Sequence, residues 1–139
     1  MKISLEDRSL YLKGLMLLIR KDRHIHDKEK NMMMRFGEIL GFEKEFCEDT
    51  INELLDNKYI LDAPPRFSKP DITRYFIKDA FRLSISDGQI HEKELAWLKA
   101  VAKTNSVEDI WFNAAAADAL TQVHGNIEER LEANNLEWE

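Results

Sequence analysis

One pattern occurs twice in the chain, first as Asp22-Arg-His-Ile25-His26-Asp27-Lys28-Glu29 and then again as Asp87-Gly-Gln-Ile90-His91-Glu92-Lys93-Glu94. Both copies read D-x-x-I-H-[DE]-K-E, and the agreement extends forward, in the same register, to aromatic pairs such as Phe46 and Trp111. A match of this length at a fixed separation indicates a tandem repeat. We therefore expect two similar halves, each with a helix, the quoted loop and two further helices.

Apolar residues on both sides of these loops recur at helical spacing and almost nowhere alternate as in a half-buried strand. The pattern predicts six helices and a seventh, acidic one at the C-terminus, with Gly41 as the stop signal of the second. The expected ranges are Leu5 to Lys21, Asp27 to Leu40, Lys44 to Asn57, a Ser68 cap to Ser86, Glu92 to Thr104, a Ser106 cap to His124, and Asn126 to Trp138.

A proline-rich segment, Ala63 to Ser68, separates the two halves. It cannot continue a helix, because proline lacks the amide hydrogen and restricts the residue before it. The expected fold class is therefore all-α, in a single domain of residues 1–139. Its pseudo-repeat halves are 5–62 and 68–125, and 126–139 forms the C-terminal helix.

The composition excludes several classes of protein. The chain has 139 residues, of which 44% are hydrophobic and 33% charged, which is typical of a single helix-rich domain. Cys47 is the only cysteine, so no internal disulfide is possible and we expect a cytoplasmic location. The net charge of −6 argues against nucleic acid as a partner. No apolar run approaches the roughly 20 residues of a membrane-spanning helix.

The duplicated loop, with an acid at a helix end, an isoleucine, and a lysine and glutamate opening the next helix, resembles the TerB-like helical domains, named for a tellurite-resistance protein. The resemblance covers nearly the whole chain. It implies an all-helical fold, a role in tellurite resistance and stress response without an established catalytic role, and acidic loop residues that are proposed to bind metal. Transferred by position, these acids are Asp22, Glu29, Asp87 and Glu94. The first loop departs from the family pattern, since Arg23 replaces the turn glycine and His24 is added.

The four acids have an ordinary structural role open to them as well. Glu29 and Glu94 fall at the third position of the following helix, where a carboxylate caps backbone amides. Asp22 and Asp87 fall at helix C-termini, where negative charge is unfavourable. They either accept hydrogen bonds from turn amides or bind a divalent metal ion.

Histidines accompany these acids. His26 and His91 stand at the same position of the repeat, and His24 adds a further imidazole in the first loop. Mixed nitrogen and oxygen ligands suit a transition metal better than calcium. Solvated surface histidines explain the same residues without a metal. The candidate metal ligands are Asp22, His26, Glu29, Asp87, His91 and Glu94.

The first loop is more positively charged than the second. Residues 20–35 carry a net charge of +3, and the equivalent residues 85–100 carry −1. An anion or an acidic partner would prefer the first loop, with Arg20, Arg23 and Lys28 as its contacts. A solvated charged face explains the same pattern.

Two further features concern partners. Trp138, expected on the acidic C-terminal helix, is a candidate contact for a protein partner, or it docks on its own domain. The small residues Ala114 to Ala117 allow close approach of helices and are interpreted as internal packing. A protein partner is therefore expected, and a homo-oligomer is left open.

Catalysis has little support in the sequence, and no catalytic residue is assigned. The chain holds no nucleophile elbow and no phosphate-binding glycine loop, and the acids around Cys47 disfavour a thiolate. The expected function is a non-enzymatic TerB-like stress-response module that acts through interactions and binds a divalent metal ion at its two loops. Two alternatives stay open: a metal-dependent hydrolase, and an adaptor that acts through protein contacts alone.

Overall fold

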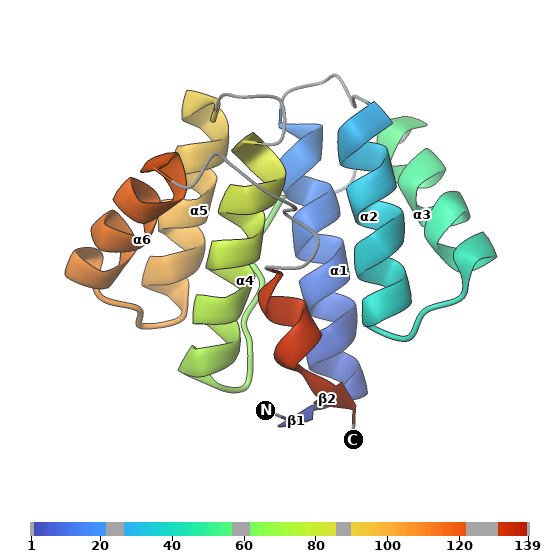
Figure 1. Cartoon of the computed structure of the whole chain (residues 1–139), viewed down its shortest axis with the longest axis horizontal. Coiled ribbons are helices and arrows are strands. Elements are labelled where there is room, and N and C mark those ends of the chain that lie inside the picture. The colour runs from blue at the N-terminus through green and yellow to red at the C-terminus, as the bar shows by residue number, and fades with distance from the viewer. Residues whose placement is uncertain (1, 22–26, 57–61, 86–89, 122–130, 139) are drawn as a thin grey trace.

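The computed structural model describes residues 2–21, 27–56, 62–85, 90–121 and 131–138 (Figure 1). Helices dominate these residues, so the predicted all-α single domain is confirmed. None of the described helices has the length and apolar character needed to cross a membrane. The elements are β1 (Lys2–Ile3), α1 (Leu5–Arg20), α2 (Asp27–Ile39), α3 (Lys44–Asp56), α4 (Pro70–Ser84), α5 (Glu92–Thr104), α6 (Asp109–Thr121), the 3-10 helix η3 (Glu132–Asn135) and β2 (Glu137–Trp138).

The helices of the second half begin in the register that aligns Asp22 with Asp87. In this register the first residue of α4 matches that of α1, α5 begins where α2 does, and α6 begins where α3 does. The last residues of α5 and α6 also match those of α2 and α3. The repeat seen in the sequence therefore coincides with a repeat of three helices.

The second helix of each half ends in the same backbone conformation. Gly41 and Ser106, which stand at the same position of the repeat, both have positive φ, at 84° and 59°. The amide after each donates to a carbonyl five residues back, a bond that closes a Schellman-type helix end. These two bonds are both 2.8 Å long and join Phe42 to Gly37 and Val107 to Ala102. Gly41 thus ends its helix as predicted.

The two halves meet along α1 and α4, which lie side by side in the middle of the molecule (Figure 1). α2 and α3 pack on α1 at one flank, and α5 and α6 pack on α4 at the other. Gly14 makes the central contact possible, because a Cβ there would lie 2.8 Å from the ring of Phe76. The ring of Tyr11 meets the same Phe76 edge-on, with centroids 5.4 Å apart.

A buried carboxylate joins these central helices to the C-terminal segment. Asp79 on α4 is 0% exposed and accepts a 2.6 Å hydrogen bond from the hydroxyl of Tyr11 on α1. It also accepts from the backbone amides of Glu132 and Ala133, at 2.6 and 2.8 Å. Arg82 adds a charged contact at 3.2 Å. Asp79 therefore fixes both the α1 to α4 packing and the chain end.

The acidic C-terminal helix predicted for 126–139 is wrong over residues 131–138, which form η3 and then β2. β2 pairs in parallel with β1 at the other end of the chain, Lys2 opposite Glu137 and Ile3 opposite Trp138. Asp79 takes the first amides of η3, and Leu131 and Leu136 are both buried against the core. Tertiary contacts therefore override the weak helical pattern of this segment. Residues 126–130 lie outside the described part of the chain.

The two predicted serine caps are wrong as well. Ser68 does not begin α4, which starts at Pro70 with Lys69 as its N-cap. Instead, the amide and hydroxyl of Ser68 both donate to the buried carboxylate of Asp7 at the start of α1. Ser106 adopts the left-handed conformation that ends α5. Both serines thus serve long-range or C-terminal contacts rather than the helix that follows them.

The Asp79 cluster predicts a pH dependence of stability. Burial raises the pKa of Asp79 from 3.8 to about 6, although its hydrogen bonds and Arg82 lower it. Between about pH 4 and 6 the folded protein thus holds a proton that the unfolded chain releases, so the free energy of unfolding falls as pH rises through this window. Over this pH window, the free energy of unfolding of the wild type should fall by at most about 3 kcal/mol relative to that of Asp79→Asn, because the amide of Asn does not titrate.

Urea unfolding of both proteins at several pH values from 4 to 7 checks this expectation. The carboxyl group is contacted by the side chains of Tyr11 and Arg82 and by the backbone amide of Glu132. These three residues stay unchanged in the comparison. A stability difference between the two proteins that is constant with pH would contradict it.

Candidate functional site

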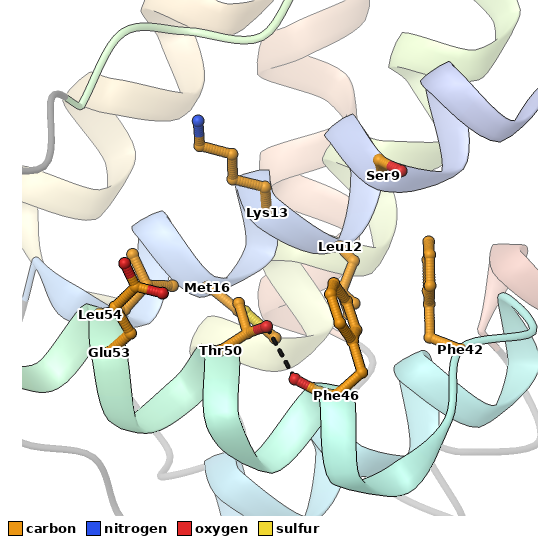
Figure 2. A pocket seen from close by; sticks show the side chains of 9 residues that line it. All are labelled: Ser9, Leu12, Lys13, Met16, Phe42, Phe46, Thr50, Glu53 and Leu54. Atoms are coloured by element: carbon orange, nitrogen blue, oxygen red, sulfur yellow. Dashed lines mark hydrogen bonds between the residues drawn. The ribbon is translucent and has the colours of Figure 1, made fainter.

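A groove between α1 and α3 contains a cavity of about 370 Å³, within the size range of small-ligand sites. α1 contributes Ser9, Leu12, Lys13 and Met16, and α3 contributes Phe46, Thr50, Glu53 and Leu54. Phe42, from the loop before α3, completes the lining. Figure 2 shows these side chains, with Ser9 and Phe42 toward one end of the groove and Glu53 and Leu54 toward the other.

The floor of the groove is apolar. Leu12, Met16 and Leu54 are all buried in the core, at 2%, 1% and 6% exposure. The rings of Phe42 and Phe46 stack at one side, with centroids 5.5 Å apart and planes 26° apart. Apolar surface of this kind has no water-facing polar group to satisfy, so the groove suits an apolar ligand group.

Phe46 is the exposed part of this apolar surface. It lies one residue before Cys47, which with Ile51 and Leu54 forms the core-facing side of α3. Its ring therefore projects at the rim of the groove and stays 52% exposed. Exposed large apolar side chains beside an apolar hollow are characteristic of interaction sites.

An acidic row runs along α3 beside the groove. Glu45, Asp49 and Glu53 are spaced four residues apart, so they follow one another along the same helix face, and all three are exposed. Glu53 also lines the cavity. Lys13 is the cation among the lining residues, on the α1 side. The α3 rim thus presents negative charge to whatever enters the groove.

The corresponding surface of the second half carries larger side chains. At the positions equivalent to Ser9, Met16 and Phe46, the second half has Arg74, Phe81 and Trp111. The guanidinium of Arg74 lies over the ring of Trp111, 6.0 Å from its centroid, and forms a 2.8 Å ion pair with Asp71. Ser9 is too short to cover Phe46 in this way. The contact that Arg74 makes over Trp111 therefore has no counterpart from Ser9 over Phe46.

The structure places two of the four predicted loop acids, Glu94 and Glu29, inside the molecule. Glu94 is 1% exposed and accepts from the hydroxyl of Ser84 at 3.0 Å and from the amide of His91 at 3.2 Å. Its capping role is thereby shown. Glu29, at the equivalent position, is 3% exposed.

The other predicted metal ligands and contacts are only partly described. Asp22, Arg23, His24, His26 and Asp87 lie outside the described residues. Within the part that is described, no three His, Cys, Asp or Glu side chains are grouped so that they could hold a metal ion. Metal binding at the loops stays a prediction.

Of the predicted anion patch, the structure describes Arg20 and Lys28. Arg20 lies 3.8 Å from the carboxylate of Asp62, which also takes a 2.6 Å contact from Lys21. Lys28 is exposed at the start of α2. For Trp138 the structure gives the backbone pairing with Ile3. The patch and a partner contact at Trp138 stay predictions.

Cys47 is a packing residue. Its side chain is 1% exposed, and a Cβ at Gly37 on α2 would lie 2.2 Å from its Sγ, so the thiol occupies the space that this glycine leaves. Burial, and secondarily Glu48, raise the pKa of the Cys47 thiol above its ordinary value. A raised pKa and a buried sulfur both oppose a role as nucleophile.

Comparison with known proteins gives no functional assignment. No family model, no curated protein and no solved structure matched this chain. The TerB-like resemblance and the stress-response role that it implies therefore stay predictions. The groove itself was not predicted, although a position-by-position comparison of the halves, Ser9 against Arg74 above all, contained its signal.

The burial of Cys47 predicts slow chemical modification. In native protein at pH 8, a thiol reagent such as dithionitrobenzoate should react at least 100-fold more slowly than in urea-unfolded protein, since both access and thiolate are reduced. The absorbance of the released thiolate follows the reaction. Equal rates in the two states would contradict the packing role.

Proposed function

We propose that this chain is a non-enzymatic interaction module that binds an amphipathic helix of a partner protein in the groove between α1 and α3. The supporting observation is the difference between the halves: an apolar groove lies beside Ser9 in the first half, whereas Arg74 lies over Trp111 at the equivalent place in the second. A long side chain at position 9 is thus compatible with this arrangement of three helices, so folding does not require the short Ser9.

The shape of the groove favours a helix as its occupant. It runs between two helices whose lining residues recur at helical spacing, Leu12 and Met16 on α1 and Phe46, Thr50 and Glu53 on α3. An apolar stripe at i, i+4 and i+7 of a partner helix fits such a channel. The hydroxyl of Thr50 donates a 2.7 Å hydrogen bond to the carbonyl of Phe46, so it does not need a hydrogen-bond acceptor from the partner.

The charge of the rim favours basic residues on that helix. Glu45, Asp49 and Glu53 would face side chains flanking the apolar stripe of the partner. Exposed charges contribute little to affinity individually, but a complementary row raises the association rate and selects the orientation. Binding should accordingly weaken with added salt.

The metal-related functions stay predictions. Divalent metal at the loops and a metal-dependent hydrolase both depend on Asp22, His26 and Asp87, which lie outside the described residues. A TerB-like role in stress response is compatible with an interaction module. The groove supports the adaptor among these alternatives.

A designed peptide tests the proposal. The probe is a labelled amphipathic helix of about 16 residues, long enough to follow α1, with leucines on one face and lysines beside them. Fluorescence anisotropy should show saturable binding, at least tenfold weaker for the same peptide with glutamates in place of lysines. Ser9→Arg, which copies the residue of the second half, and Asp49→Lys should each weaken binding at least tenfold.

Matched controls separate groove effects from general ones. Glu92→Lys makes the same charge change as Asp49→Lys at an exposed site on α5 and should leave binding unchanged. Thermal unfolding should show Ser9→Arg to be as stable as the wild type, because position 9 is exposed. Failure of the lysine peptide to bind, or equal binding by Ser9→Arg, would refute the proposal.

A further inference from the structure

α6 carries an uncovered apolar stripe at the flank opposite the groove. Ile110 is 82% exposed and Leu120 is 58% exposed, while Ala114 and Ala117 between them are exposed too. The predicted internal packing of the Ala114 to Ala117 run holds only for Ala115 and Ala116, which contact the core. Phe112 is the buried anchor of this helix.

The arrangement of three helices in each half does not require apolar residues along this stripe. α3 occupies the equivalent place in the first half, and its residues equivalent to Ile110, Ala114 and Ala117 are Glu45, Asp49 and Asn52. All three of those polar residues are exposed. Three of the four stripe positions are thus polar in one half and apolar in the other, while Leu120 corresponds to a second leucine, Leu55. At the three differing positions, α3 shows that a polar residue is compatible with the same place in the fold.

We infer that a second copy of this chain covers the stripe, with the two α6 helices antiparallel about a twofold axis between Ala114 and Ala117. The stripe reads large, small, small, large along the helix, and this order is the same in both directions. An antiparallel pair therefore sets each alanine against an alanine and brings Ile110 near Leu120 of the second copy. Such an isologous contact needs one self-complementary surface, and the stripe is one.

The charges of α6 are compatible with a second copy and argue against a membrane surface. Residues 109–121 contain no lysine or arginine, and their acids are Asp109 and Asp118. The antiparallel register sets Asp118 level with Asn113 of the second copy, so an amide rather than another carboxylate faces it. A helix with this charge has no attraction for an anionic membrane surface, which calls for basic residues.

A dimer of this kind leaves both grooves accessible. α6 and α3 lie at opposite flanks of the molecule (Figure 1), so contact through α6 directs the two grooves away from each other. The dimer would then be bivalent toward a partner with two helical segments. Because one helix per chain forms the contact, we expect a dissociation constant of about 10–100 µM rather than a permanent dimer.

Sedimentation velocity of the full chain at about 5 to 500 µM tests the inference. With a dissociation constant of this size, mass action shifts the population from mostly monomer to mostly dimer over this range. The weight-average mass should rise from 16.3 kDa toward twice that value. Ile110→Glu, which copies the residue of α3, should shift the dissociation constant upward at least tenfold. Phe46→Glu in the groove is the matched control and should leave the association unchanged.

Circular dichroism melting of Ile110→Glu confirms that the variant is folded, and Ala114→Asp, which also copies α3, provides a second independent variant. A wild type that stays monomeric over the whole concentration range overturns the inference. Association that survives both α6 variants, or that Phe46→Glu abolishes, also overturns it by locating the contact elsewhere.

Discussion

The close packing of α1 against α4 is the constraint on which the rest of the molecule depends. Gly14 lets the ring of Phe76 approach the backbone of α1, and Tyr11 from the same helix reaches across to the buried carboxylate of Asp79. Asp79 in turn holds the amides at the start of η3. One contact region thus positions both three-helix units and both chain ends, and it leaves α3 and α6 as the outer helices.

The duplication keeps the buried glutamate and the helix end of each half and varies the outer helices. Glu29 and Glu94 are buried at the same repeat position, and the Schellman-type ends of α2 and α5 have the same bond lengths. The outer helices differ in what they expose to solvent: α3 has acidic residues beside an apolar groove, and α6 has an apolar stripe and a tryptophan, Trp111, that lies under Arg74. One frame therefore offers two chemically distinct surfaces.

The fold was largely predictable, because helix periodicity and the internal repeat are signals that reinforce each other. The errors came where distant residues decide the local structure. Ser68 is a good cap by composition, but Asp7, far away in the sequence, binds it instead. The C-terminal segment has a weak helical pattern that Asp79 overrides. The groove was missed because it arises from a side chain that is absent at Ser9, and only the comparison with Arg74 shows it.

Mapping the binding site of the probe helix on the protein by NMR tests the central claim most directly. The account predicts that titration with the lysine-bearing peptide shifts the methyl signals of Leu12, Met16 and Leu54. The methyl signals of Ile77 and Ala119 should not shift. These two residues stand in the second half at the positions equivalent to Leu12 and Leu54. Shifts confined to the second half, or scattered over both halves, would contradict it, because they would show that the open groove does not distinguish one half from the other.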